Sequence, residues 1–310
     1  MSGVIGAASA EEIMKKAYER KILIPGFNVA YLPMMKPIVK ALVDLETFGL
    51  VEVARVEVEK FEAGSFAAVA HEYKTFAQRL ENRSHTRLHM DHIPVIDEDG
   101  ARVDWKRWIQ EGLNLEYDSV MIDGSRLSLE ENMETTRQVV EMAHARGTPV
   151  EAELGAVLGH EKELTLTYEE IYEKKVGFTN PDEARVFVDE TGVDWLSVAV
   201  GNIHGAVSGV AKDKDKVKAR LDITHLSQIS EATNVPLVLH GGSGIGSEYI
   251  LSAIESGITK INIGTDIRQA YEKALKSKPN DVAHAQEQVY EKIKDLVTNF
   301  YRIKGSIHKL

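Results

Sequence analysis

Three histidines in this chain each follow a short run of β-forming residues. His92 closes the run that begins at residue 86. His204 follows Leu196–Val200, and His240 follows Pro236–Leu239. The carboxyl ends of parallel strands meet at one face of a domain, so three imidazoles placed in this way can converge on one point. Three neutral nitrogen ligands and one open position are typical of a catalytic zinc ion. We therefore predict a metal site at the three histidines.

Carboxylates accompany these histidines. Asp91 directly precedes His92, and a carboxylate beside a metal-polarised hydroxyl or carbonyl can move its proton. The alternative role for Asp91 is to orient a histidine ligand from behind. His89 lies one strand period before Asp91, deeper in the domain, and we interpret it as structural. Glu151 and Glu153 share one face of VEAELG, and Glu153 is a candidate ligand of the metal or of a second cation; binding of neighbouring backbone N–H groups is the alternative.

Two glycine-containing turns follow the last two predicted strands. Gly241 begins GGSG ahead of a helix near Ser247, and Asn262 begins NIGTD ahead of another helix. Successive backbone N–H groups at a helix N-terminus bind anions. We predict a phosphate site here, completed by Asn262 and Thr265; the alternative is a pair of tight loops without a ligand.

Eight β-rich runs alternate with amphipathic helical patterns. This rhythm predicts an α/β fold, a (β/α)8 TIM barrel, as one domain over residues 1–310. A doubly wound open sheet is the alternative, but its glycine turn normally follows the first strand rather than the last two. The predicted strands are Ile22–Asn28, Leu50–Val56, Thr86–Asp91, Ser119–Asp123, Pro149–Glu153, Trp195–Val200, Pro236–His240 and Lys260–Ile263.

Two long connections interrupt the rhythm, over residues 94–104 and 159–180. Long loops after barrel strands usually carry function, so we predict active-site loops at both places. The alternative is a solvated excursion.

The composition excludes several classes of function. The net charge is −11 and the basic residues are scattered, which argues against a nucleic-acid or membrane partner. The chain has no cysteine, so disulfides and thiolate ligands are impossible. No apolar run approaches the ~20 residues that span a bilayer, and the N-terminus lacks the pattern of a secretory signal. We expect a cytoplasmic protein.

The motifs LHMDH, DSVMIDGS, VEAELG, IHG, LHGGSG and NIGTD, in this order over nearly the whole chain, resemble the class II, zinc-dependent ketose-bisphosphate aldolases of the fructose- and tagatose-bisphosphate types. That family cleaves a ketose bisphosphate reversibly to dihydroxyacetone phosphate and an aldehyde phosphate. The resemblance implies a catalytic Zn²⁺, a monovalent cation (Na⁺ or K⁺) near the phosphate, a sugar-phosphate substrate and a homodimer or homotetramer.

The resemblance also implies roles for single residues. Zinc would be held by His92, His204 and His240 and would polarise the ketone. Asp91 would take the proton of the C4 hydroxyl, and Glu161, on a mobile loop, would protonate the resulting carbanion. The residues implied in substrate and phosphate binding are Asn28, Gly205, Gly241, Ser243, Asn262, Thr265 and Arg268.

Three positions depart from the family pattern. Ser208 stands where a lysine is common, and Gly264 stands where fructose enzymes carry an acid and tagatose enzymes a small residue. Arg55 lies where a small polar residue is usual, and we predict that it meets an anionic group of the substrate. The leading hypothesis is an aldolase acting on a phosphorylated ketose. A metal-dependent epimerase, or an aldolase for another sugar phosphate or sugar acid, is the alternative, and a non-catalytic sugar-sensing or assembly module is a third.

Overall fold

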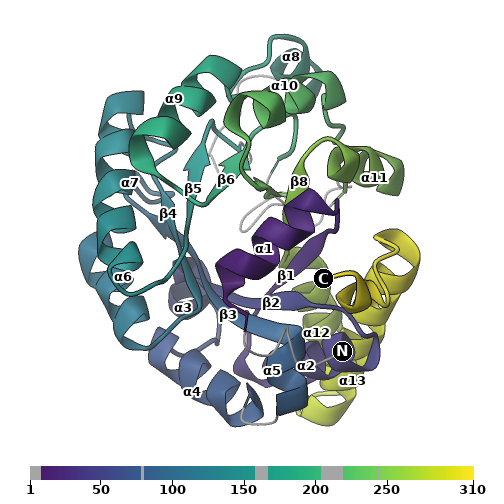
Figure 1. Ribbon diagram of the computed structural model, residues 1–310. Helices are drawn as coiled ribbons and strands as arrows, with labels where there is room; N and C mark the ends of the chain where they lie inside the picture. The colour runs from purple at the N-terminus through teal and green to yellow at the C-terminus, as the bar shows by residue number, and fades with distance from the viewer. Residues whose placement is uncertain (1–7, 78–79, 158–166, 204–218, 243) are drawn as a thin grey trace.

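The computed structural model describes residues 8–77, 80–157, 167–203, 219–242 and 244–310, apart from the side chains of 80–82. Eight parallel strands close into a barrel in chain order, with the eighth strand paired to the first (Figure 1). This confirms the predicted (β/α)8 barrel and rules out the open sheet. The strands are β1 (Ile24–Asn28), β2 (Gly49–Ala54), β3 (Thr86–Pro94), β4 (Ser119–Asp123), β5 (Val150–Leu154), β6 (Trp195–Val198), β7 (Leu237–Leu239) and β8 (Ile258–Ile263).

Helices surround the barrel between the strands. They are α1 (Ala10–Glu19), α2 (Met35–Asp44), α3 (Arg55–Lys60), α4 (Phe66–Ala77), α5 (Leu80–His85), α6 (Trp105–Asn114), α7 (Leu129–His144), α8 (Tyr168–Glu173), α9 (Pro181–Thr191), α10 (Ile223–Thr233), α11 (Ser247–Glu255), α12 (Thr265–Ser277) and α13 (Val282–Asp295). Several begin with the side-chain caps that the sequence provides; the hydroxyl of Ser128, for example, accepts a hydrogen bond from Glu131 N at the start of α7. No helix within the described ranges is long and apolar enough to cross a membrane.

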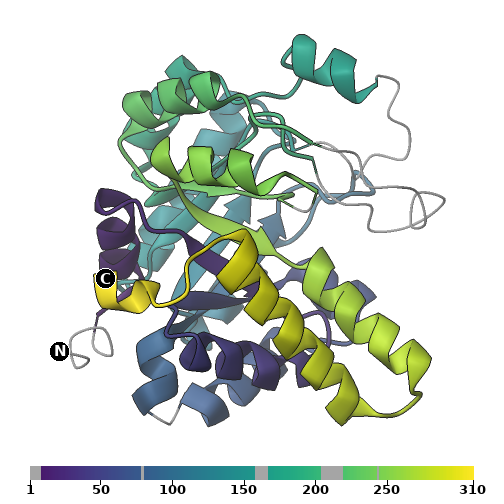
Figure 2. The ribbon, with the colours of Figure 1, turned by 90° about the vertical axis from the view of Figure 1, so that its right-hand side faces the viewer.

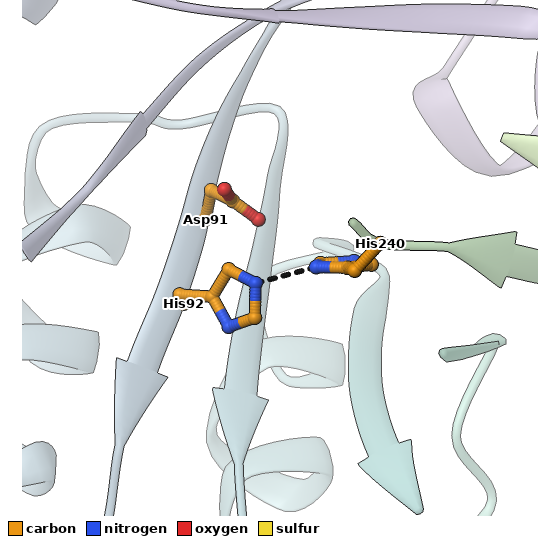
Figure 3. Close-up of side chains that lie close together, drawn as sticks. All are labelled: Asp91, His92 and His240. Carbon is orange, nitrogen blue, oxygen red and sulfur yellow. Dashed lines mark hydrogen bonds between the residues drawn. The ribbon is translucent and has the colours of Figure 1, made fainter. Parts of the chain in front are cut away.

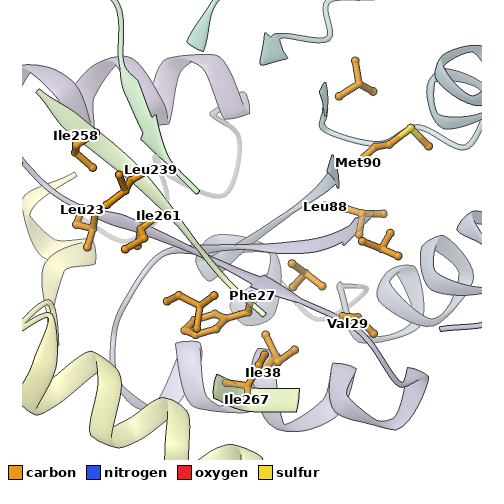
Figure 4. Close-up of a cluster of buried hydrophobic side chains, with 14 of the residues drawn as sticks. Leu23, Phe27, Val29, Ile38, Leu88, Met90, Leu239, Ile258, Ile261 and Ile267 are labelled. Atoms are coloured by element: carbon orange, nitrogen blue, oxygen red, sulfur yellow. The ribbon is translucent and has the colours of Figure 1, made fainter. Parts of the chain in front are cut away.

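The outward side chains of the strands form the main core. Leu88 and Met90 on β3 and Ile261 on β8 are buried between the barrel and its helices (Figure 4). Side chains alternate along a strand, so the residues between them point into the barrel. Burying one such aliphatic side chain contributes about 1.5–3 kcal/mol, which makes this shell the main stabilising layer of the fold.

Helix α1 closes the amino-terminal end of the barrel. It lies across the opening in Figure 1 and at the end away from the strand tips in Figure 2. Its Ile13 and Met14 belong to one buried cluster with Leu50, Trp195 and Val238, which lie at or near the starts of their strands. This apolar plug closes the amino-terminal opening of the barrel, so the site lies at the carboxyl-terminal end.

The structure corrects two predicted strand ends with consequences for the site. We predicted a second strand through Val56, but β2 ends at Ala54 and the chain turns at once into α3. The third strand also continues beyond Asp91, because β3 remains paired with β4 as far as Pro94.

Candidate active site

An irregularity in β3 brings two neighbouring side chains to the same end of the barrel. Met90 pairs with Val120, whereas Ile93 pairs with Ile122, so β3 has one more residue than β4 over this stretch. The extra residue is a β-bulge, and His92 within it has a positive φ of 34°. The bulge interrupts strict alternation, which lets Asp91 and His92 both face the mouth although they are adjacent in sequence.

His92 and His240 face one another across the barrel mouth. Nε2 of His92 lies against Nδ1 of His240, with the rings nearly perpendicular (Figure 3). A carboxylate lies near the other nitrogen of each ring. Glu151 Oε1 lies 2.8 Å from His240 Nε2, and Asp123 Oδ2 lies 3.4 Å from His92 Nδ1. A carboxylate behind an imidazole keeps a proton on its own side, so the nitrogens that face each other can turn their lone pairs toward a metal ion.

This donor set fits a divalent metal ion. One ligand atom from each of Asp91, His92 and His240 lies within 4.8 Å of the others. Imidazole nitrogens are typical ligands of zinc, and the carboxylates behind the rings are the usual support of such a site. Asp91 lies beside both rings, where it can reach a group bound to the metal. The third predicted ligand, His204, lies outside the described residues. The structure thus brings together two of the three predicted histidines.

Asp91 is held by two amides from neighbouring strands. Asn28 Nδ2 donates to Oδ2 at 2.8 Å, and Asn262 Nδ2 donates to Oδ1 at 2.9 Å. The side chain is almost fully buried. Burial by itself would raise the pKa of Asp91, but the nearby His92 and Lys260 outweigh it and hold that pKa below its usual range. Asp91 is therefore an ionised, oriented carboxylate next to the candidate metal ligands.

Glu153 lies behind His92 rather than between the two histidines. Its Oε2 is 4.0 Å from His92 Nδ1 and accepts a hydrogen bond from Ser197 Oγ at 3.3 Å. With His92 and Asp123 it forms a second group that could hold a metal ion. Burial, and then the negative charge of Asp123, raises the pKa of Glu153 to about 8. A cation at this position would relieve both effects.

A charged layer that we did not predict supports the site from below. Lys260 Nζ is 2.7 Å from Glu151 Oε2 and 2.9 Å from Glu52 Oε1, and all three side chains are fully buried. His89 lies in the same layer, where its Nδ1 is 2.8 Å from Ser119 Oγ. Burial, and then the positive charge of Lys260, lowers the pKa of His89 to about 3, so the ring is neutral. This buried position below the metal site agrees with the prediction that His89 has a structural role.

A signal for this layer exists in the sequence. Lysine is almost never fully buried without a charged partner, and Lys260 lies within the otherwise mostly apolar run ITKINI. Strand alternation places Lys260 on the same inward face as Asn262. Glu52 and Glu151 lie on other strands, and no local pattern identifies them as the two partners of Lys260.

A pocket opens above these residues at the carboxyl ends of the strands. Five of the predicted substrate-binding residues line it: Asn28, Gly241, Asn262, Thr265 and Arg268. The guanidinium of Arg268 is 2.8 Å from Glu272 Oε1 and lies over the ring of Phe61. Thr265 is the first residue of α12, so the backbone N–H groups of that helix face the same pocket. The other predicted residues, Gly205, Ser243, Glu161 and Ser208, lie outside the described part of the chain.

Arg55 does not take the predicted position. Because β2 ends at Ala54, Arg55 lies in the first turn of α3, where it forms ion pairs with carboxylates of the same chain. Nη1 is 2.5 Å from Glu59, and Nη2 is 3.5 Å from Asp97 and 3.4 Å from Glu98. The substrate role is therefore withdrawn. The partners Asp97 and Glu98 belong to the 94–104 connection, which folds into a small hairpin bridged between residues 96 and 102.

Comparisons with known proteins agree with this geometry. The family model described as "Fructose-bisphosphate aldolase class-II" matches residues 8–309. The YdjI aldolase of Escherichia coli K12 is 27% identical, with a TM-score of 0.75, over 97% of this chain and 99% of that one. Two further structures share the fold. One is a putative fructose-1,6-biphosphate aldolase of Coccidioides immitis, with 24% identity and a TM-score of 0.74 over 98% of this chain and 99% of that one. The other is the fructose-bisphosphate aldolase of Campylobacter jejuni, with 18% identity and a TM-score of 0.71 over 96% of each chain.

Proposed function

The chain belongs to the class II fructose-bisphosphate aldolase family and is therefore a carbon–carbon lyase of a family that uses a divalent metal, and on that premise we propose a zinc-dependent cleavage of a phosphorylated ketose. The products are dihydroxyacetone phosphate and an aldehyde, from a ketose of the fructose or tagatose type. The observation that carries the proposal is the convergence of Asp91, His92 and His240 at the mouth of the barrel.

Each part of the pocket has a role in this reaction. His92 and His240, together with His204, hold the zinc, which when bound polarises the substrate ketone. The α12 N-terminus, the Gly241–Gly242 turn and Thr265 bind the phosphate of the dihydroxyacetone half. Asp91 accepts the proton of the C4 hydroxyl as the C3–C4 bond breaks. Asn28 and Asn262 keep both oxygens of Asp91 aligned for that transfer.

Other features of the family complete the proposal. Glu161 returns a proton to C3, and Glu153 supports His92 or binds a second cation. A monovalent cation assists phosphate binding. We further propose a cytoplasmic homodimer or homotetramer in which residues 1–310 act as one barrel domain.

Product analysis tests this function. The zinc-loaded protein is incubated with fructose and tagatose phosphates, and dihydroxyacetone phosphate is measured by a coupled assay while ketoses are followed by NMR. We expect dihydroxyacetone phosphate in stoichiometric amounts with the aldehyde, and loss of the activity with a chelator. Conversion of one ketose into its epimer without three-carbon products would instead identify an epimerase.

A further inference from the structure

Glu57 is a buried carboxylate in the substrate pocket that the reaction described above does not use. It lies in α3, in the short turn that follows β2, and lines the pocket with Asn28, Asp91 and His92. Only 9% of the residue is exposed. The early end of β2 explains its place: the helical turn directs Arg55 outward to the hairpin and Glu57 inward to the pocket.

The carboxylate is held by a backbone group that does not neutralise it. Its Oε2 accepts a hydrogen bond from Ala54 N at 2.5 Å. Asn28, whose amide donates to Asp91, lines the same pocket. Burial, followed by the negative charge of Asp91, raises the pKa of Glu57 to about 7. Burial of an acid without a cationic partner lowers the stability of the fold, which indicates that a group of a ligand binds to Glu57 in the pocket.

Cations near this wall of the pocket are already paired. Arg55 is paired with Glu59, Asp97 and Glu98. Arg268, which lies over the ring of Phe61, is paired with Glu272. Within the described residues, Glu57 itself has no lysine or arginine partner.

The order of groups across the pocket indicates which part of the substrate reaches Glu57. The α12 N-terminus and the Gly241–Gly242 turn lie on the β7 and β8 side, and His92 and His240 face each other at the mouth. Asp91 takes the C4 hydroxyl proton, so the chain beyond C4 extends toward β1 and β2. That is the wall formed by Glu57, Val56 and Phe61.

We propose that Glu57 determines the substrate class: it accepts a hydrogen bond from a hydroxyl of the aldehyde-derived half and excludes a phosphate there. The inference rests on the proposed aldolase function and deepens it. The substrate is then a ketose monophosphate phosphorylated at the dihydroxyacetone end. Its C3–C4 bond breaks, the C4 hydroxyl proton passes to Asp91 as the aldehyde forms, and the bonding pair on C3 takes up a proton to give dihydroxyacetone phosphate.

The physical reason is repulsion between like charges. A hydroxyl can donate to the free electron pairs of Glu57, whereas a phosphate dianion would face two carboxylates, Glu57 and Asp91, without a free cation among the described residues. Like charges brought together in a partly desolvated site cost enough to change binding at least about tenfold.

The experiment compares two substrates that differ only in the distal phosphate. The values of kcat/KM for zinc-dependent release of dihydroxyacetone phosphate are measured for fructose 1-phosphate and fructose 1,6-bisphosphate, and for the tagatose pair. We expect the monophosphate to be preferred by at least about tenfold. Glu57→Gln keeps the shape and an acceptor for Ala54 N, and should reduce the preference about tenfold through faster cleavage of the bisphosphate. Glu62→Gln, an exposed acid on the same segment, is the matched control and should leave the ratio unchanged.

The wild-type ratio is decisive even if Glu57→Gln folds poorly. Equal or faster cleavage of the bisphosphates by the wild-type protein would overturn the role of Glu57 and leave the aldolase function intact. A preference for the monophosphates that Glu57→Gln does not change would also overturn it. No cleavage of any of the four ketoses by the zinc-loaded protein would overturn the proposed function itself, and the inference with it.

Discussion

Replacing Lys260 by methionine tests whether the buried charged layer supports the metal site. The methionine fills most of the volume of the lysine but removes the cation between Glu52 and Glu151. Burial alone would lower the pKa of Lys260, but the two carboxylates outweigh it and raise that pKa, so the side chain is charged in the folded protein. The substitution therefore leaves two carboxylates in a fully buried layer without their counter-ion.

The size of the effect follows from this burial. Removing one partner of a buried ion pair costs about 3–5 kcal/mol, because an uncompensated charge remains in the interior. Part of that cost is relieved when Glu52 takes up a proton, since burial already raises its pKa well above the usual value. We therefore expect a loss of about 3 kcal/mol in the free energy of unfolding.

A second effect concerns the metal. Glu151 accepts from His240 on one side and pairs with Lys260 on the other, so loss of Lys260 releases the carboxylate that orients His240. Loss of such a supporting partner weakens metal binding about 10- to 100-fold.

Both effects are measurable on the same variant. Urea unfolding of the chelator-treated protein gives the stability, and competition with a chromophoric chelator gives the zinc Kd. Lys273→Met, at an exposed position of α12, is the control and should change stability by less than about 0.5 kcal/mol. If Lys260→Met matches this control in stability and in zinc affinity, the reasoning about the charged layer is refuted.

Three further predictions concern single residues. His92→Ala should lose bound zinc, as measured by atomic emission after dialysis, whereas His71→Ala, at an exposed position, should retain it; a full zinc content in His92→Ala would remove His92 from the ligand set. Asp91→Asn should keep its zinc but lose at least about 100-fold in kcat, since proton transfer contributes 10²–10⁴-fold; near-normal turnover would limit Asp91 to orienting a ligand. Partial burial by itself would raise the pKa of Asp222, but the backbone N–H of His225 and the side chain of Lys175 outweigh it and lower that pKa. Its folded-state pKa is thus depressed, so its stabilisation is present above a pH of about 4 and is lost as pH falls below that value. Asp222→Asn should be about 0.5 kcal/mol less stable at pH 7 and equal to wild type near pH 2 in urea titrations; a constant difference at both pH values would contradict this.

Much of the fold follows from local pattern. The eight strands were predicted within a few residues because β-branched runs alternate with amphipathic helices, and the barrel follows from their number and order. The error at β2 has a physical cause. VEVARVEVE alternates apolar and polar residues both before and after Val53–Ala54, where the alternation shifts by one residue. Its valine-rich pattern therefore favours a strand on both sides of Ala54, and tertiary contacts turn residues 55–60 into α3 instead.

The site was predictable where chemistry is local in sequence. Asp91 and His92 were found together because they are adjacent, and His240 because it ends a strand. The bulge that turns both side chains of the pair to one side depends on register with β4, which the sequence of β3 does not contain. For the same reason Arg55 was assigned to the pocket in place of Glu57, and the partners of Lys260 on β2 and β5 were not anticipated.

The most direct test of the central claim is proton exchange at C3 of dihydroxyacetone phosphate in D₂O, followed by ¹H NMR. This half-reaction needs the metal site and the phosphate site but not the aldehyde, so it does not depend on the identity of the natural ketose. The zinc-loaded protein should exchange one C3 proton stereospecifically, and a chelator should abolish the exchange until zinc is restored. Absence of exchange in a protein shown to contain stoichiometric zinc would contradict the assignment of His92 and His240 to the metal site of an aldolase.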